Sequence, residues 1–109
     1  MPATSRHIRG WVRHVGVEPA AGHHEQLAVE IRLADIRGHE EYAQWLSTHY
    51  LGDQLVDSLQ IHHGDDVEVR LERDAGGRLT KESFVQNHTR GLRYTFVRQA
   101  RRGWQLWRR

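Results

Sequence analysis

The chain has 109 residues, of which 38% are hydrophobic and 28% are charged, and it contains no cysteine. This length suits one domain with a modest core, and the lack of cysteine excludes disulfide bridges, iron–sulfur clusters, cysteine zinc sites and thiol nucleophiles. The formal net charge of +2 hides an uneven distribution, because residues 1–17 carry three arginines, residues 90–109 carry seven, and all 14 acids lie in between.

Two strands are predicted in the first third of the chain. Residues 7–17 alternate, so that one face of the strand carries Ile8 and Val12 and the other carries aromatic and basic side chains. A loop that begins at Pro19 follows. Residues 26–37 alternate more strictly, and the apolar face of this strand consists of Leu27, Val29, Ile31 and Leu33.

The segment 39–51 fits two different periods. Its apolar side chains recur with helical spacing at Tyr42, Trp45, Leu46, His49 and Tyr50. The same residues also fit a two-residue repeat of side chains that favour strands. We prefer the helix, because acidic residues would occupy its first turn and Gly52 would end it. A second short helix could then begin at Asp53 and carry Leu59.

The second half of the chain predicts turns and further strands. Residues 67–72 alternate apolar with charged side chains, which is typical of a strand with one buried face. The sequence from Asp74 to Gly77 predicts a tight hairpin turn. Residues 79–89 would then form the return strand. Residues 92–97 alternate again, which indicates another strand or an extension of the previous one.

Two local motifs carry a resemblance to a known family. The segment from Ile61 to Val69 places Gly64-Asp65 before an alternating strand, and Phe84 to Thr89 follows after the hairpin. Together they resemble the Gly-Asp, alternating Val, hairpin and Val-x-Asn-x-Thr ending of small bacterial OB-fold domains, over about residues 7–90. The resemblance implies a small β-barrel and oligonucleotide binding across strands 2 and 3 and the 1–2 and 4–5 loops. The expected fold is therefore mainly β with one helix, OB-fold-like, and the alternative is an α+β fold with an antiparallel sheet and one crossover helix.

Aromatic and arginine side chains are interleaved at both ends of the chain, and proteins that bind single strands combine basic grooves with rings on which bases stack. We expect a single domain at residues 1–98, a basic aromatic tail at residues 99–109, and a non-enzymatic module that binds single-stranded DNA or RNA. Phosphate neutralisation and stacking would supply the affinity, with little reading of base identity. The predicted nucleic-acid-binding residues are Arg9, Trp11, Arg13, Arg93, Tyr94, Arg98, Arg101, Arg102, Trp104 and Trp107.

A protein–protein interaction or oligomerisation domain whose tail docks on a partner is the alternative function, since Trp and Arg are enriched at binding hot spots. The rings have a second interpretation as core residues. No cofactor, metal ligand or catalytic residue is predicted, because the adjacent pairs His23-His24 and His62-His63 point apart and no catalytic motif occurs. The chain has no apolar run of about 18 residues and no signal-peptide pattern, so we expect a cytoplasmic protein without a membrane partner.

Overall fold

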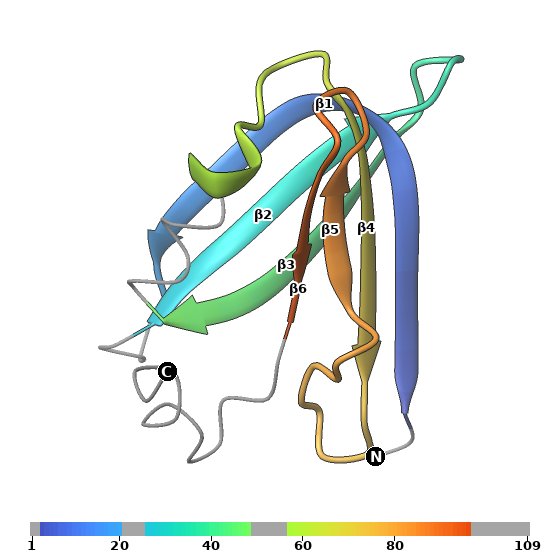
Figure 1. Ribbon diagram of the computed structural model, residues 1–109. Helices are drawn as coiled ribbons and strands as arrows, with labels where there is room; N and C mark the ends of the chain where they lie inside the picture. The colour runs from blue at the N-terminus through green and yellow to red at the C-terminus, as the bar shows by residue number, and fades with distance from the viewer. Residues whose placement is uncertain (1–2, 21–25, 49–56, 97–109) are drawn as a thin grey trace.

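The computed structural model describes residues 3–20, 26–48 and 57–96, and its described part is one antiparallel sheet with a short helix at residues 57–59 (Figure 1). Neighbouring strands follow the order β3-β2-β1-β4-β5-β6. The mainly β prediction is therefore confirmed. The six strands are β1 (Thr4–Pro19), β2 (Gln26–Ala34), β3 (Glu40–Thr48), β4 (Asp66–Arg73), β5 (Phe84–Asn87) and β6 (Leu92–Thr95).

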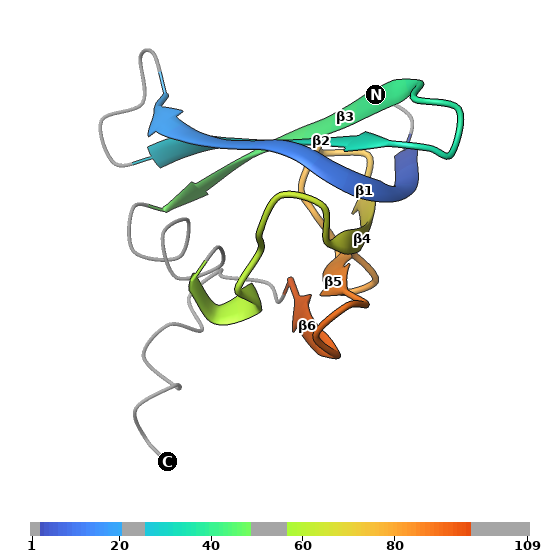
Figure 2. The same ribbon diagram turned by 90° about the horizontal axis from the view of Figure 1, so that it is seen from above.

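Strand β1 is long and bent, and it belongs to both halves of the sheet. Its first half, Thr4 to Trp11, pairs with β4, whereas Trp11 to Pro19 pairs with β2. The bend lies at Gly10, where a β-carbon would be 2.4 Å from the carbonyl oxygen of Ala34, and a bulge follows at once. Because β1 changes partner there, the sheet curls until β1, β2 and β3 form one layer and β4, β5 and β6 another (Figure 2).

The core fills the space between these two layers. Alternate side chains of β2 and β4 point into it, as the sequence periodicity predicted. The ring of Phe96, just after β6, packs edge to face on Trp45 of β3, with the ring centroids 5.6 Å apart. This contact joins the two ends of the sheet, although β3 and β6 remain its unpaired edges among the described residues. The fully buried larger side chains are Ile31, Leu33, Leu59, Val29, Val67, Val69 and Val85.

The helix preferred for residues 39–51 is wrong over its described part, because Glu40–Thr48 is strand β3 and pairs with β2 along its whole length. The two-residue period is the one that the fold uses. Trp45 is buried at 3% exposure, whereas Tyr42 and Leu46, which share its helical stripe, are 52% and 46% exposed on the opposite face. Pairing with β2 and burial of Trp45 therefore override the helical spacing.

Most of the other predicted strands and turns are present, with ends that differ by a few residues. The first strand is longer than predicted and the second ends at Ala34, before a turn in which Gly38 has a φ of 86°. The predicted hairpin turn is confirmed, since the Gly77 N–H donates to the Asp74 carbonyl. The return strand is shorter than predicted: only Phe84–Asn87 pairs continuously with β4, after an isolated bridge at Leu79. No helix among the described residues is long and apolar enough to cross a membrane.

Candidate functional site

The two motifs that carried the family resemblance lie against each other. The side-chain amide of Asn87, which is fully buried, donates to Asp65 Oδ2 at 2.9 Å and to the carbonyl of Leu59 at 3.0 Å. The N–H of Asp66 donates to the Thr89 hydroxyl at 2.8 Å, and the His88 N–H donates back to the Asp66 carbonyl at 2.7 Å. These bonds fasten the segment before β4 to the end of β5.

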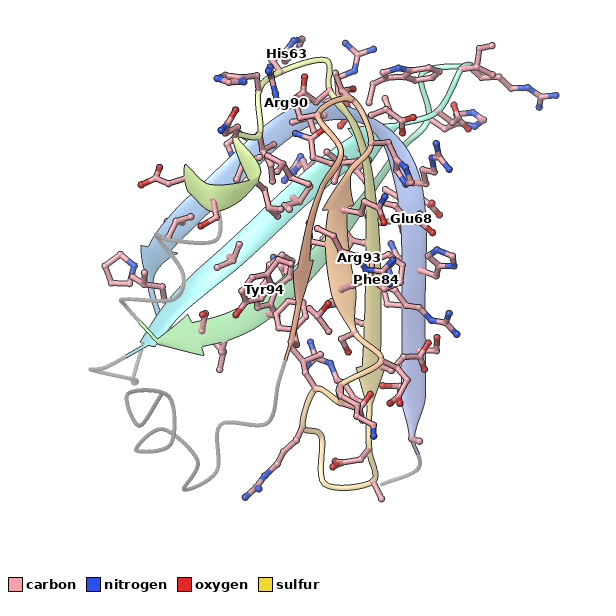
Figure 3. The ribbon with its side chains drawn as sticks, in the orientation of Figure 1. His63, Glu68, Phe84, Arg90, Arg93 and Tyr94 are labelled. Carbon is pink, nitrogen blue, oxygen red and sulfur yellow. The ribbon has the colours of Figure 1, made fainter. Side chains whose placement is uncertain are left out.

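Asp65 is the centre of this junction. Its Oδ2 also accepts the N–H of His62 at 3.1 Å and Arg90 Nε at 2.9 Å. Burial alone would raise the pKa of the Asp65 carboxyl, but the hydrogen bonds from Asn87, His62 and Arg90 hold it below its ordinary value. The carboxylate thus stays charged and fixes the turn that contains His63, which is labelled at the top of Figure 3.

This turn forms one wall of an open hollow of about 440 Å³. A second wall comes from β1 just after its bend, and the third is the connection between β2 and β3. The bulge in β1 explains one part of the lining, because the extra residue places Trp11, Val12 and Arg13 side by side at the rim. The lining residues are Trp11, Val12, Arg13, Asp35, Ile36, Arg37, Gly38, His63 and Gly64.

The hollow combines an exposed indole with positive charge. Trp11 is 45% exposed, and no ion pair joins the side chain of Arg13 or Arg37 to any other described residue. Asp35 is the one acid in the lining, and its Oδ1 accepts the N–H groups of Arg37 at 2.8 Å and His39 at 2.9 Å. One oxygen of Asp35 therefore shapes the loop, while the side chain as a whole is 49% exposed and adds a negative charge to the same lining as the two arginines.

The outer face of β1 continues from the hollow through Arg9. This side chain pairs with Asp66 through two bonds, from Nε to Oδ1 at 3.1 Å and from Nη2 to Oδ2 at 2.9 Å. The bond from Arg9 is the main cause that lowers the pKa of the Asp66 carboxyl. Arg9 and Trp11 thus lie along one side of β1, whereas Arg13 is the extra residue of the bulge, where the alternation is interrupted, and Val15 beyond it packs against the core. Arg9 has an ion-pair partner, and Arg13 has none among the described residues.

Of the remaining predicted residues, the structure separates Arg93 and Tyr94 from this group. Arg93 of β6 lies over the ring of Phe84, 3.9 Å from its centroid, on the outer face (Figure 3). Tyr94 points the other way and packs edge to face on Phe96, at 5.1 Å between centroids. Burial raises the pKa of the Tyr94 hydroxyl, and the ring is a core-facing side chain as well as a predicted ligand. Outside the described residues lie Arg98, Arg101, Arg102, Trp104 and Trp107.

Sequence reasoning missed Arg37, Ile36 and His63 as members of the site. Arg37 was placed inside a strand, and His63 was treated as a turn residue. The available signal was their position in the two connections next to Gly38 and Gly64, since binding residues concentrate on loops held by a rigid scaffold.

Within the described ranges, no three His, Asp or Glu side chains are placed to hold a metal ion. No protein-family model, no curated protein and no solved structure matches this chain. The hollow and the outer face of β1 are therefore interpreted from their own geometry and chemistry.

Proposed function

We propose that this chain is a non-enzymatic, OB-fold-like module that binds single-stranded nucleic acid, and that the hollow beside the β1 bend is its principal contact. The observation that carries the proposal is that the exposed ring of Trp11 lines the same hollow as Arg13 and Arg37, two side chains with no ion-pair partner among the described residues. A base can stack on an indole and two phosphates can contact the guanidinium groups, which is how sequence-tolerant binding to single strands arises.

The arrangement of strands supports the OB-fold part of the proposal. One bent strand serves both halves of a curled antiparallel sheet, and the loop between β2 and β3 and the turn before β4 meet at its bend. An OB fold binds its ligands across strands 2 and 3 and on the 1–2 and 4–5 loops, whereas the hollow lies at the connection between β2 and β3. The resemblance therefore supports the strand arrangement and not the position of the site. A duplex fits this surface poorly, because its bases are stacked and paired and expose no ring face to Trp11. A cytoplasmic location, where such ligands occur, is part of the same proposal.

The direct test is a fluorescence-anisotropy titration of the full chain with labelled single-stranded and duplex oligonucleotides at two salt concentrations. We expect Trp11→Ala to weaken single-strand binding by roughly 5- to 150-fold, since one base–aromatic stack contributes about 1–3 kcal/mol. Tyr42→Ala is the matched control, because Tyr42 is similarly exposed at 52% but does not line the hollow. It should leave the affinity unchanged.

The two arginines of the hollow are tested by the salt dependence of the affinity. We expect Arg13→Ala and Arg37→Ala each to reduce the slope of log affinity against log salt by about 0.7, the value for one phosphate contact on a single strand. Arg78→Ala is the control, since Arg78 lies in the exposed connection between β4 and β5, at the opposite end of the molecule from the hollow (Figure 1).

Three outcomes would contradict the proposal. Equal affinity for duplex and single strand would remove the stacking argument. An unchanged affinity in Trp11→Ala, with a complete loss in the double variant Trp104→Ala/Trp107→Ala, would move the interface to the tail. Absence of binding at low salt, with self-association or capture of a protein partner that depends on residues 99–109, would favour the adaptor function.

A further inference from the structure

A chain of hydrogen bonds crosses the outer face of the sheet from β6 to β1. Arg93 Nη1 donates to Gln86 Oε1 at 3.2 Å, and Gln86 Nε2 lies 3.4 Å from His88 Nδ1. His88 Nε2 bonds to Glu68 Oε1 at 2.8 Å, and the other oxygen of Glu68 bonds to His7 Nε2 at 2.6 Å. Figure 3 shows the central carboxylate, Glu68, on the same side of the sheet as Arg93.

The donors and acceptors in this row of hydrogen bonds are compatible with one protonation state of His88. Arginine can only donate, so the oxygen of the Gln86 amide must face Arg93 and its NH₂ group must face His88 Nδ1. Nδ1 therefore accepts and carries no proton. An ionised carboxylate can only accept, so the ring proton lies on Nε2, toward Glu68. His88 is thus a neutral imidazole in this arrangement.

Protonation of His88 reverses the requirement at Nδ1. A protonated Nδ1 would face the NH₂ group of Gln86, and two donors cannot bond. Rotation of the amide by half a turn offers its oxygen to His88, but it then presents its NH₂ group to Arg93. This rotation breaks the bond between Gln86 and Arg93, and Arg93 then keeps its contact with the Phe84 ring.

We propose that this row of hydrogen-bonded side chains is a pH switch. Uptake of a proton by His88 turns the Gln86 amide and releases Arg93. The outer face of β1, β4, β5 and β6 then becomes a cationic surface for the phosphates of a single strand. The inference rests on the proposed function and adds its regulation. Before protonation the arginines Arg9, Arg70 and Arg93 of this face are opposed by the acids Asp66, Glu68 and Glu72, and Glu82 adds a further negative charge near Arg70. Charging His7 and His88 makes it positive.

The switch lies on the path that a bound strand would follow. His7, Arg9 and Trp11 lie on the same side of β1, and four residues of a strand span about 13 Å, or roughly two nucleotides. A strand stacked on Trp11 can therefore reach His7 and the neighbouring His88. The acid that contacts both rings is Glu68, 2.6 Å from His7 Nε2 and 2.8 Å from His88 Nε2, and Asp66 is a second acid near His88.

The switch can be measured without any ligand. We expect the side-chain NH₂ resonances of Gln86 and the Nε–H resonance of Arg93 to shift with the same midpoint as the His88 ring between pH 7.5 and pH 5, in ¹⁵N-labelled protein. In the His88→Gln variant these resonances should no longer shift with pH. The control variant His62→Gln, which changes an exposed histidine that takes no part in these hydrogen bonds, should retain the shifts. Titration of His88 with no change at Gln86 or Arg93 would overturn the inference.

Anisotropy titrations of a single-stranded oligonucleotide at pH 7.5 and pH 5.5 test the consequence for binding. Each proton taken up on binding raises the affinity by up to about tenfold per pH unit. Each protonated histidine that contacts a phosphate steepens the salt slope by about 0.7. We expect wild type to gain at least tenfold at the lower pH and His88→Gln to lose most of that gain. Equal affinity at both pH values would refute the inference and leave the proposed function standing, whereas no binding at either pH would refute the proposed function itself.

Discussion

The bend of β1 makes a specific prediction about Gly10. In Gly10→Ala the new β-carbon would lie 2.4 Å from the carbonyl oxygen of Ala34 and 2.9 Å from its carbonyl carbon. Ordinary contact begins near 3.4 Å, so the two backbones must separate by about 1 Å. Ala34 cannot retreat freely, because it pairs with Trp11 on one side and Glu40 on the other.

Overpacking of this kind costs about 1–3 kcal/mol, and the high value applies here because the obstacle is backbone. We therefore expect Gly10→Ala to reduce the free energy of unfolding by about 2–3 kcal/mol in urea titrations, and Tm by roughly 10–20 °C. Gly16→Ala on the same strand is the control, since its β-carbon would meet the His14 imidazole at 3.0 Å, and a side chain can rotate away. Both variants reduce the freedom of the unfolded chain equally, so their difference isolates the contact. A loss of stability no larger in Gly10→Ala than in Gly16→Ala would refute the close approach at the bend.

Three further predictions concern stability. Asn87→Ala should lower the free energy of unfolding, measured in urea, by about 2–4 kcal/mol, because the buried Asp65 carboxylate and the Leu59 carbonyl each lose a hydrogen-bond donor. A free energy equal to that of the wild type would contradict the role of Asn87 in joining the segment before β4 to β5. Trp45→Ala should cost about 3–5 kcal/mol, whereas Tyr42→Ala on the same strand should cost less than about 1 kcal/mol, and equal costs would contradict the strand assignment of β3. Because the pKa values of Asp65 and Glu68 are lowered on folding, their contribution is complete at neutral pH and is lost as the pH falls below about 4, through their native pKa values. Tm recorded from pH 7 to pH 3 should therefore fall, and Asp65→Asn should flatten that fall.

The strands could be predicted wherever the side chains of a segment fit only one periodicity. Residues 26–34 and 67–72 alternate without a competing pattern, and both lie in strands with the predicted buried faces, although the first was predicted to continue to Arg37. Residues 39–51 carry two periods at once, and the choice between them depends on β2, whose edge pairs with the segment. Because β2 lies outside this segment, the spacing of side chains within the segment does not show that the two will pair.

The candidate site was predictable only in the part that lies on one strand. Arg9 and Trp11 follow from alternation along β1, whereas Arg13 lies at the bulge that interrupts this alternation. Arg37 and His63 join them because a bend in β1 brings two connections together, and the bend depends on the close approach of Gly10 to Ala34. A periodicity of two residues describes a straight strand, so it cannot indicate which loops meet across a bent one.

The structure also changes the meaning of the charge distribution. The acids between residues 18 and 89 do not form a uniform negative field on the outer face, because Asp65, Asp66, Glu68 and Glu72 are each bonded to a basic side chain. Screening at physiological salt limits the influence of exposed charges to about 8 Å, so a phosphate at the hollow experiences mainly the charges that line it, those of Arg13, Arg37 and Asp35. Two arginine contacts there give a salt slope near 1.4, whereas the five arginines within residues 97–109 would add about 3.5. The slope measured at neutral pH therefore distinguishes binding in the hollow from binding by the tail before any residue is changed.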